Sequence, residues 1–206
     1  MITAVPSVPL AVVGQEPRER ADAARNRERI LAAAAGLVAE RGIEHVSMDD
    51  VARAASVGTG TVYRRFGDRA GLALALLDEE TRAFQDALIA GPPPLGPGAP
   101  AADRLRAFGE GYLDLLERHG QLVAAGTGGG VARGGVQAFY ATHLVILLRE
   151  VAPHLDAEFT AQALLATLAP REYLRQRRGL EWSLERVRAG WCALADALSG
   201  AAAEGR

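Results

Sequence analysis

Two short helical patterns lie within the stretch from Ser47 to Arg69, SMDDVARAASVGTGTVYRRFGDR, and only three residues separate them. The separating residues, Ser56-Val57-Gly58, are too few for anything except a tight turn. Helices joined in this way cross at a steep angle and share an apolar contact, which is the helix-turn-helix arrangement. This constraint predicts that the chain is helical here, with each short helix packed against the next.

The first helix is predicted to begin after Ser47. Ser47 as N-cap and Asp50 three residues later form a variant of the capping box, with Asp in place of Glu or Gln. Asp49 and Asp50 lie in the first turn, where the helix dipole favours negative charge. One narrow apolar face, predicted to pack on neighbouring helices, consists of Met48, Val51, Ala52 and Ala55.

The second helix is predicted from about Thr59 to Phe66. Val62 and Phe66 are four residues apart and therefore share the side that must be buried. At about 100° per residue, the remaining positions point away from this apolar pair. The residues free to meet a partner are Thr59, Gly60, Tyr63 and Arg64.

The charge of this stretch favours duplex DNA as the partner. No acidic residue occurs from Ser56 to Gly67, whereas Arg64 and Arg65 are adjacent and Arg69 follows. Phosphates are attracted to such a local surface even though the whole chain has a net charge of −2. Gly60 has no side chain to hold DNA away, and Thr or Tyr hydroxyls bind base edges or phosphates.

The segments ILAAAAGLVAERGIEHVSMDDVARAASV and GTGTVYRRFGDRAGL, within Arg25 to Leu72, resemble the DNA-binding domain of the tetracycline-repressor (TetR) family of bacterial regulators. The resemblance implies an all-α fold: a three-helix DNA-binding domain with the helix-turn-helix, a fourth connecting helix, and a helical C-terminal domain for ligand binding and dimerisation. It also implies that bases are approached by Thr59, Gly60 and Tyr63, and that phosphates are held by Ser47, Thr61, Arg64 and Arg69. We add Arg65 to the DNA-binding candidates on its charge.

Three positions depart from the usual family pattern. Ser56 stands where the family usually has a turn glycine, and a non-glycine residue in a left-handed conformation costs about 1 kcal/mol. Gly58 replaces the usual Ser or Thr cap, although Gly is an acceptable N-cap. Arg69 stands where the family usually has Lys. None of the three removes the resemblance.

The rest of the chain predicts further helices and three parts. The parts are a mobile N-terminal tail at 1–21, the helix-turn-helix domain at 22–71, and a helical effector-binding and dimerisation domain at 72–206. The arginines of the region around residue 20 fit either an arm that touches DNA or a solvated helix start. Helices are expected at about Asp22 or Asn26 to Arg41, Arg69 to Ile89, Ala101 to His119, Val136 to Val151, Asp156 to Leu168, and Leu184 to Leu198, with a Pro/Gly loop at Gly91 to Pro100.

The helix at 136–151 is apolar around most of its circumference, which indicates that other helices surround it. Its aromatic and polar residues, with two from the preceding helix, either line a cavity for a small-molecule effector or form ordinary core packing. The candidate pocket residues are Phe108, Tyr112, Phe139, Tyr140 and His143.

The last helix carries a seam with intervals of three, four, three and four residues: Leu184, Val187, Trp191, Leu194 and Leu198. Such a seam can be buried within one chain or against a second copy. The family resemblance favours a homodimer formed by the last two helices, which adds Phe159, Ala163 and Ala166 to the candidate dimer interface. A two-fold dimer presents two reading helices to a pseudo-palindromic operator.

Enzymatic and metal chemistry have little support. The single Cys192 cannot form an intramolecular disulfide, no Cys/His spacing suits zinc, and no cofactor motif is found. The glycines at 126–130 lack a strand context and fit a flexible joint better than a phosphate loop. With a single cysteine, a reducing cytoplasm is the expected compartment. The apolar start of the chain is too short to span a membrane.

The leading hypothesis is a one-component transcriptional regulator, taken as a repressor, that leaves its operator when an effector binds. Two alternatives remain open. One is a small helical enzyme using His143 and the glycine-rich joint, and the other is a protein-interaction module in which Arg64 and Arg65 only form a solvated face.

Overall fold

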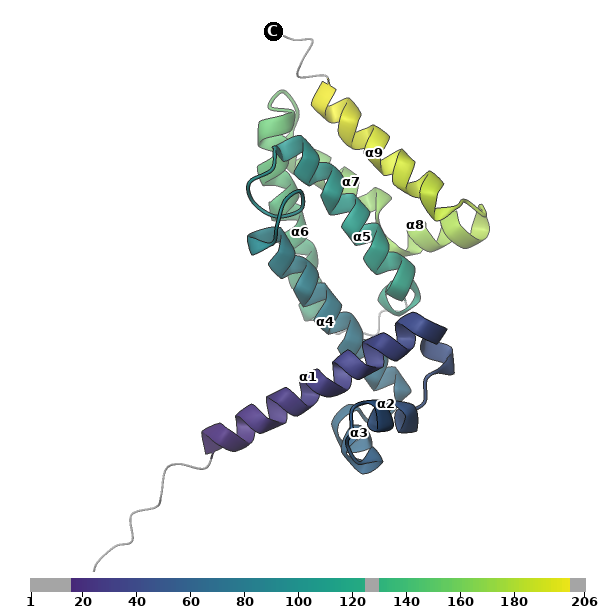
Figure 1. Ribbon diagram of the computed structural model, residues 1–206. Helices are drawn as coiled ribbons and strands as arrows, with labels where there is room; N and C mark the ends of the chain where they lie inside the picture. The colour runs from purple at the N-terminus through teal and green to yellow at the C-terminus, as the bar shows by residue number, and fades with distance from the viewer. Residues whose placement is uncertain (1–15, 125–129, 201–206) are drawn as a thin grey trace, which may run out of the picture. The chain divides into compact units, whose positions relative to one another are not determined.

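The computed structural model describes residues 16–124 and 130–200, and these form helices and loops without any β-strand (Figure 1). The predicted all-α fold is confirmed. The chain divides into two compact units, Met1–Leu72 and Ala73–Arg206, with the division inside one long helix. Each unit is considered by itself. The predicted tail up to residue 15 and the glycine-rich joint at 125–129 lie outside the described residues.

Unit 1 consists of three helices, a short 3-10 turn and the start of a fourth helix. Their bounds are α1 Glu16–Arg41, η1 Ile43–His45, α2 Met48–Ala54, α3 Thr59–Phe66 and the first residues of α4 Arg69–Ala90. The side chains at its centre, none with any exposed surface, are Ile30 and Ala34 of α1, Val51 of α2, Val62 of α3 and Leu72 of α4. Because each helix contributes to this core, the angle between α2 and α3 is fixed by burial.

Helix α1 is longer than the sequence predicted. It begins at Glu16 rather than at Asp22 or Asn26, so residues 16–21 of the predicted tail are helical. Pro17 is tolerated in a first helical turn, and the Glu and Arg residues that follow are good helix formers. The predicted end is confirmed: Gly42 adopts φ 79°, and its N–H donates to the carbonyl of Val38 at 2.8 Å.

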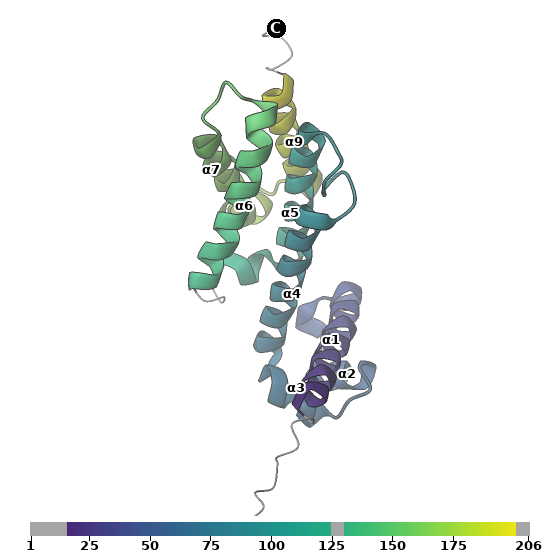
Figure 2. The same cartoon turned by 90° about the vertical axis from the view of Figure 1, so that its left-hand side faces the viewer.

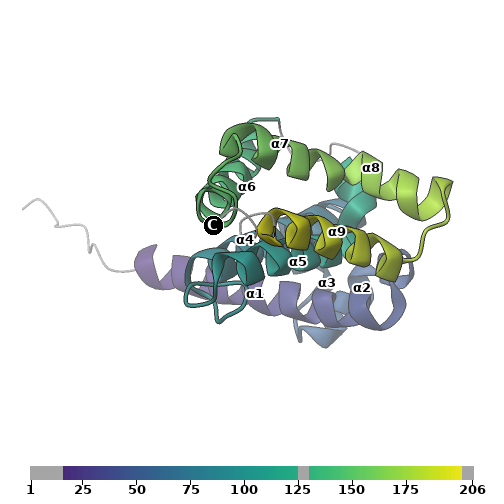
Figure 3. The ribbon, with the colours of Figure 1, turned by 90° about the horizontal axis from the view of Figure 1, so that it is seen from above.

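Unit 2 is a bundle arranged around α5. Its elements after α4 are α5 Ala101–Ala124, α6 Gly130–Val151, α7 Ala157–Thr167, α8 Pro170–Leu174, a π-helical turn η2 Arg175–Gly179, and α9 Leu184–Gly200. Helix α5 packs against α6, α8 and α9, and α7 packs against α6 (Figures 2 and 3). No helix among the described residues is long and apolar enough to cross a membrane.

The sequence placed most of these helices within a few residues. Helix α5 continues to Ala124 rather than ending near His119, and α6 begins earlier than Val136. Pro170 forms the first residue of α8, a position where its missing N–H costs nothing. The π-helical turn was not predicted.

Helices α5 and α9 pack closely in unit 2. The indole of Trp191 lies against Gly109 so tightly that a Cβ at residue 109 would be 1.9 Å from Trp191 Cε2. Trp191 Nε1 also donates to the carbonyl of Arg106 at 3.1 Å, which fixes the ring. Trp191 is therefore only 3% exposed within a single chain.

Gly109→Ala should destabilise unit 2 by about 1–3 kcal/mol, because the added methyl group displaces the indole from a packed core. Urea unfolding followed by tryptophan fluorescence measures the change. Gly135→Ala in α6 is the matched control, since a Cβ there meets nothing within 4 Å. It should stabilise by up to about 1 kcal/mol. Equal stability of the two variants would contradict this account of the α5–α9 contact.

Candidate nucleic-acid interface

Helix α2 begins with the predicted capping box. The Asp50 N–H donates to Ser47 Oγ at 3.0 Å, and the Ser47 N–H donates to Asp50 Oδ2 at 3.3 Å. The Ser47 hydroxyl also donates to Asp50 Oδ2 at 2.7 Å. These bonds lower the pKa of the Asp50 carboxyl. They also fix the start of α2, next to the exposed Ser47 side chain.

The turn between α2 and α3 has the predicted conformation. Ser56 adopts φ 52°, the left-handed region usually occupied by glycine, and the Val57 N–H donates to the Ala52 carbonyl at 2.9 Å. Gly58 is the N-cap of α3 in an ordinary extended conformation, φ −69° and ψ 138°, without a side-chain cap. The helix therefore starts at Thr59, as predicted.

Helix α3 exposes the face that the sequence predicted. Val62 is completely buried, whereas Tyr63 is 50% exposed and Arg64 and Arg65 are exposed. Gly60 is exposed, and a Cβ there would meet nothing within 4 Å. Thr59 and Thr61 are half-buried. The outer surface of α3 thus carries hydroxyls, guanidinium groups and one position without a side chain.

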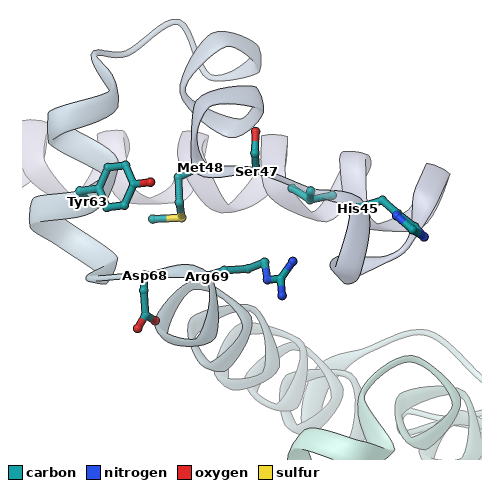
Figure 4. A pocket seen from close by; sticks show the side chains of 7 residues that line it. His45, Ser47, Met48, Tyr63, Asp68 and Arg69 are labelled. Carbon is teal, nitrogen blue, oxygen red and sulfur yellow. The ribbon is translucent and has the colours of Figure 1, made fainter.

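A cleft of about 380 Å³ brings three of the predicted DNA-binding residues together: Ser47 at the start of α2, Tyr63 on α3 and Arg69 at the start of α4 (Figure 4). His45 and Asp68 also line this cleft and were not among the candidates. Asp68 caps α4 by accepting from the Gly71 N–H at 2.8 Å, and its carboxylate points away from Ser47 and Tyr63 (Figure 4). We call this space the α2–α4 cleft.

A second cleft, of about 360 Å³, lies between α1 and α3. It is lined by Asp22, Ala23, Asn26, Thr61, Arg64 and Arg65. Arg65 Nη1 donates to the carbonyl of Ala23 at 2.5 Å, and the Arg27 guanidinium lies 5.9 Å from the centre of the Phe66 ring. Arg65 therefore ties α3 to α1. Sequence reasoning assigned it only to DNA, because nothing local reveals a backbone partner so far away in the chain.

Two helices joined by a tight turn, with hydroxyls and arginines on the outer face of the second, define a helix-turn-helix reading head. The family model for bacterial regulatory proteins of the tetR family matches residues 30–76. This match confirms the resemblance to the TetR family that was inferred from the sequence.

Comparisons with individual proteins agree. An HTH-type transcriptional regulator of Staphylococcus aureus is 37% identical over 65 residues, which are 32% of this chain and 35% of that protein. The chain thus spans about a third of the length of the curated relatives it matches.

Three solved structures show the same fold over more of the chain. The TetR transcriptional regulator SCO0520 from Streptomyces coelicolor is 26% identical, with a TM-score of 0.55, over 84% of this chain and 97% of that chain. A TetR-family transcriptional regulator from Rhodococcus sp. is 25% identical, with a TM-score of 0.56, over 85% and 99% of the two chains. FadR from Bacillus subtilis, solved in complex with stearoyl-CoA, is 17% identical over 82% and 96%, with a TM-score of 0.52, and its likeness is in the fold alone.

The predicted pocket residues of unit 2 form a packed aromatic cluster. Phe108 and Tyr112 are stacked with centroids 6.1 Å apart, and Tyr140 lies edge-on to both. His143 stacks on Phe108 at 5.9 Å. Phe139 contacts the Tyr140 ring at 5.9 Å. Phe84 of α4 also joins the cluster, and the sequence analysis missed it because its helix gave no sign of which face would meet α5.

Burial controls the protonation of this cluster. It raises the pKa of Tyr112 to about 12 and also raises the pKa of Tyr140. Burial, helped by the positive charge of Arg104, lowers the pKa of His143 to about 4. All three groups are therefore neutral at pH 7. Tyr140 Oη and His143 Nε2 are buried without a hydrogen-bond partner.

The predicted dimer residues differ in exposure. Phe159 is 73% exposed and Leu194 is 46% exposed, and Ala163 and Ala166 are also exposed. Trp191 instead belongs to the core of the single chain. Half-buried residues that pack against that same core are Leu184, Val187 and Leu198. The exposed apolar surface of α7 and α9 is thus narrower than the predicted seam.

Metal ligands are not gathered in unit 1 or unit 2: among residues 16–124 and 130–200, no three His, Cys, Asp or Glu side chains meet in a way that holds a metal ion. Cys192 is half-buried, and its thiol donates to Glu110 Oε1 at 3.3 Å. Burial, together with this bond, raises the pKa of the thiol, so it stays protonated.

The pKa of His143 makes stability depend on pH. The folded group titrates at about 4 and its ordinary value is 6.5, so between these values the unfolded chain binds a proton that the folded chain does not. The free energy of unfolding should therefore fall as pH falls from 6.5 to 4, by at most about 1.4 kcal/mol per pH unit from this group. Urea unfolding of wild type and His143→Gln across this range measures it. Carboxylates such as Glu117 contribute equally to the pH dependence of both proteins, so their effect cancels when the two are subtracted. If the free energies of unfolding of the two proteins changed in parallel with pH, the prediction would be contradicted.

Proposed function

We propose that this protein is a homodimeric transcriptional repressor that binds a pseudo-palindromic duplex operator through α3 and releases it when a small molecule binds unit 2. The observation that carries the proposal is the outer face of α3. On this face Tyr63 and Arg64 are exposed, Gly60 has free space around it, and the α2–α4 cleft lies next to them. No catalytic residues, cofactor or membrane association are part of the proposal, and the expected compartment is the cytoplasm.

Within this interface each residue has a role that follows from its position. Thr59, Gly60 and Tyr63 approach base edges, since they lie on the part of α3 that is free to enter a major groove. Phosphates are held by hydroxyls and guanidinium groups around the two clefts, from Ser47, Thr61, Arg64 and Arg69. Arg65 is a positioning residue, because its bond to the Ala23 carbonyl supports α3 from α1.

The dimer is proposed to form through the exposed apolar residues of α7 and α9. Phe159, Ala163 and Ala166 lie at helical spacing on α7, and Leu194 lies on α9 among other exposed small residues: Gly190, Ala193 and Ala197. Small side chains allow helices of two subunits to approach closely, and a large exposed aromatic ring is costly without a partner. We exclude Trp191 from this interface because the core of one chain already buries it.

Effector release is proposed to follow from linkage between the two units. A ligand that binds one arrangement of the dimer better than the other lowers operator affinity by its difference in affinity for the two arrangements. The aromatic cluster of unit 2 supports such a site through its unpaired Tyr140 and His143. The complex of the similarly folded FadR with stearoyl-CoA offers a parallel.

Selection of bound duplexes from a random DNA library tests operator binding. The bound sequences should converge on a two-fold symmetric site. Arg64→Ala should then weaken binding to the selected site. It should also reduce the slope of log K against log salt concentration by about one, because one phosphate contact is lost. Tyr63→Ala should relax the base preference instead. Arg149→Ala on α6 is the control and should bind like wild type. A library that yields no preferred sequence, or binding insensitive to salt, would refute the proposal.

Phe159→Glu should convert the dimer into a monomer, because two charges would be buried at the two-fold interface. Sedimentation velocity measures the mass, and operator affinity should fall with it. Ile89→Glu is the matched control: Ile89 is 60% exposed on α4, outside the proposed interface. The dimer surface would be wrong if wild type is monomeric or if Phe159→Glu remains dimeric.

A further inference from the structure

Arg104 of α5 is a positive charge in unit 2 without a counter-ion. Its Nη2 donates to the carbonyl of Leu88 at 3.3 Å, and its Nε is buried with no hydrogen-bond partner. No carboxylate of residues 16–124 or 130–200 lies within ion-pair distance of it. A half-buried guanidinium in this state loses water without gaining an ionic partner, which is costly.

His143 of α6 places a second unpaired nitrogen at the same end of the cluster. Its ring stacks on Phe108, one helical turn from Arg104 on α5, and its Nε2 is buried without a partner. Because His143 stacks on the residue one turn after Arg104, the two groups lie on the same side of the cluster, and the charge of Arg104 contributes to the lowered pKa of His143. A neutral imidazole beside a guanidinium can donate to an anion together with it.

Aromatic rings continue from this polar end. Phe108 stacks on Tyr112, and Phe84 and Tyr140 lie across them with centroids between 5.3 and 6.2 Å apart. Tyr140 is only 1% exposed, and its hydroxyl has no hydrogen-bond partner. Flat rings next to unsatisfied polar groups suit a molecule with a flat apolar body and polar substituents.

The half-buried Phe84 is the ring best placed to give way to such a molecule. It rests on the backbone of α5 at Gly111, where a Cβ would be 2.7 Å from Phe84 Cε2. Phe84 also lies 5.7–6.2 Å from the rings of Phe108, Tyr112 and Tyr140, so its rotation would uncover these rings together with the flat backbone at Gly111.

We infer that the effector is a small aromatic carboxylic acid, with its carboxylate bound by Arg104 and His143 and its ring held among Phe84, Phe108 and Tyr140. This inference rests on the effector response proposed above. An anion supplies the missing counter-ion of Arg104 and accepts from His143, whereas a neutral amide supplies no charge and an amine is repelled by Arg104. The hydroxyl of Tyr140 binds a polar substituent on the far side of the ring.

Matched series of ligands test the inference. Each series has an acid, its primary amide and the corresponding amine on one body, with phenylpropyl, naphthyl and indolyl bodies as the three series. Calorimetric titration of the full chain should find at least one acid that binds at least about tenfold more tightly than its amide. If no acid in any series binds better than its amide, the inference is overturned.

Arg104→Met should abolish the preference for the acid and leave the unliganded protein at least as stable to heat, because an unpaired charge is removed. Arg106→Met is the control on the same helix, since Arg106 is engaged with Asp196 at the surface. It should keep the preference. An Arg104→Met protein that still prefers the acid would overturn the inference.

Two further measurements separate this inference from the proposed function. NMR titration of His143 should show its pKa rising from about 4 when the bound acid is present, which a merely structural histidine would not show. Operator affinity is measured with and without the same acid. If acids bind but no operator is found, the proposed function fails and the inference stands. If the operator is bound and no acid binds or weakens it, the inference fails.

Discussion

Burial of Val62 is the constraint on which the reading head depends. Helix α3 has only 8 residues, and Val62 at its middle has no exposed surface. Once this side chain enters the core made by α1 and α2, the helical repeat decides where every other residue of α3 points. Tyr63 and Arg64 must then face outward. A single apolar contact thus fixes the direction of the chemically important side chains, without any interaction among those side chains themselves.

Local interactions explain why so much of unit 1 could be predicted from the sequence. Three features depend only on residues three or four positions apart: the capping box of Ser47 and Asp50, the left-handed Ser56, and the helix end at Gly42. The residues that form each feature are therefore close together in the sequence and can be recognised there. The bond from Arg65 to Ala23 joins residues 42 apart and uses a backbone carbonyl, which no pattern reveals. The α2–α4 cleft could not be predicted either, because it forms only when folding brings the starts of α2 and α4 next to Tyr63 of α3.

Trp191 shows the same limit in unit 2. The spacing of the α9 seam identifies an apolar face, but it does not say whether that face meets the same chain or a second one. Gly109 determines that Trp191 packs within the same chain. Because α5 has no side chain at this position, the indole fits against its backbone and donates to the Arg106 carbonyl. Only the paired helices show this fit. The proposed dimer surface is therefore limited to the outer side of α7 and α9, where Phe159 and Leu194 are exposed.

The two units treat polar groups in opposite ways. Unit 1 keeps Arg64 in water, so the phosphate contact proposed for it would have little desolvation cost. Unit 2 holds Arg104, Tyr140 and His143 with buried atoms that lack partners, and such groups weaken a fold unless something satisfies them. A chain selected only for stability would replace them with apolar residues of similar size. Their presence together, around rings that one molecule can span, is best explained by a ligand that supplies the missing charge and acceptors.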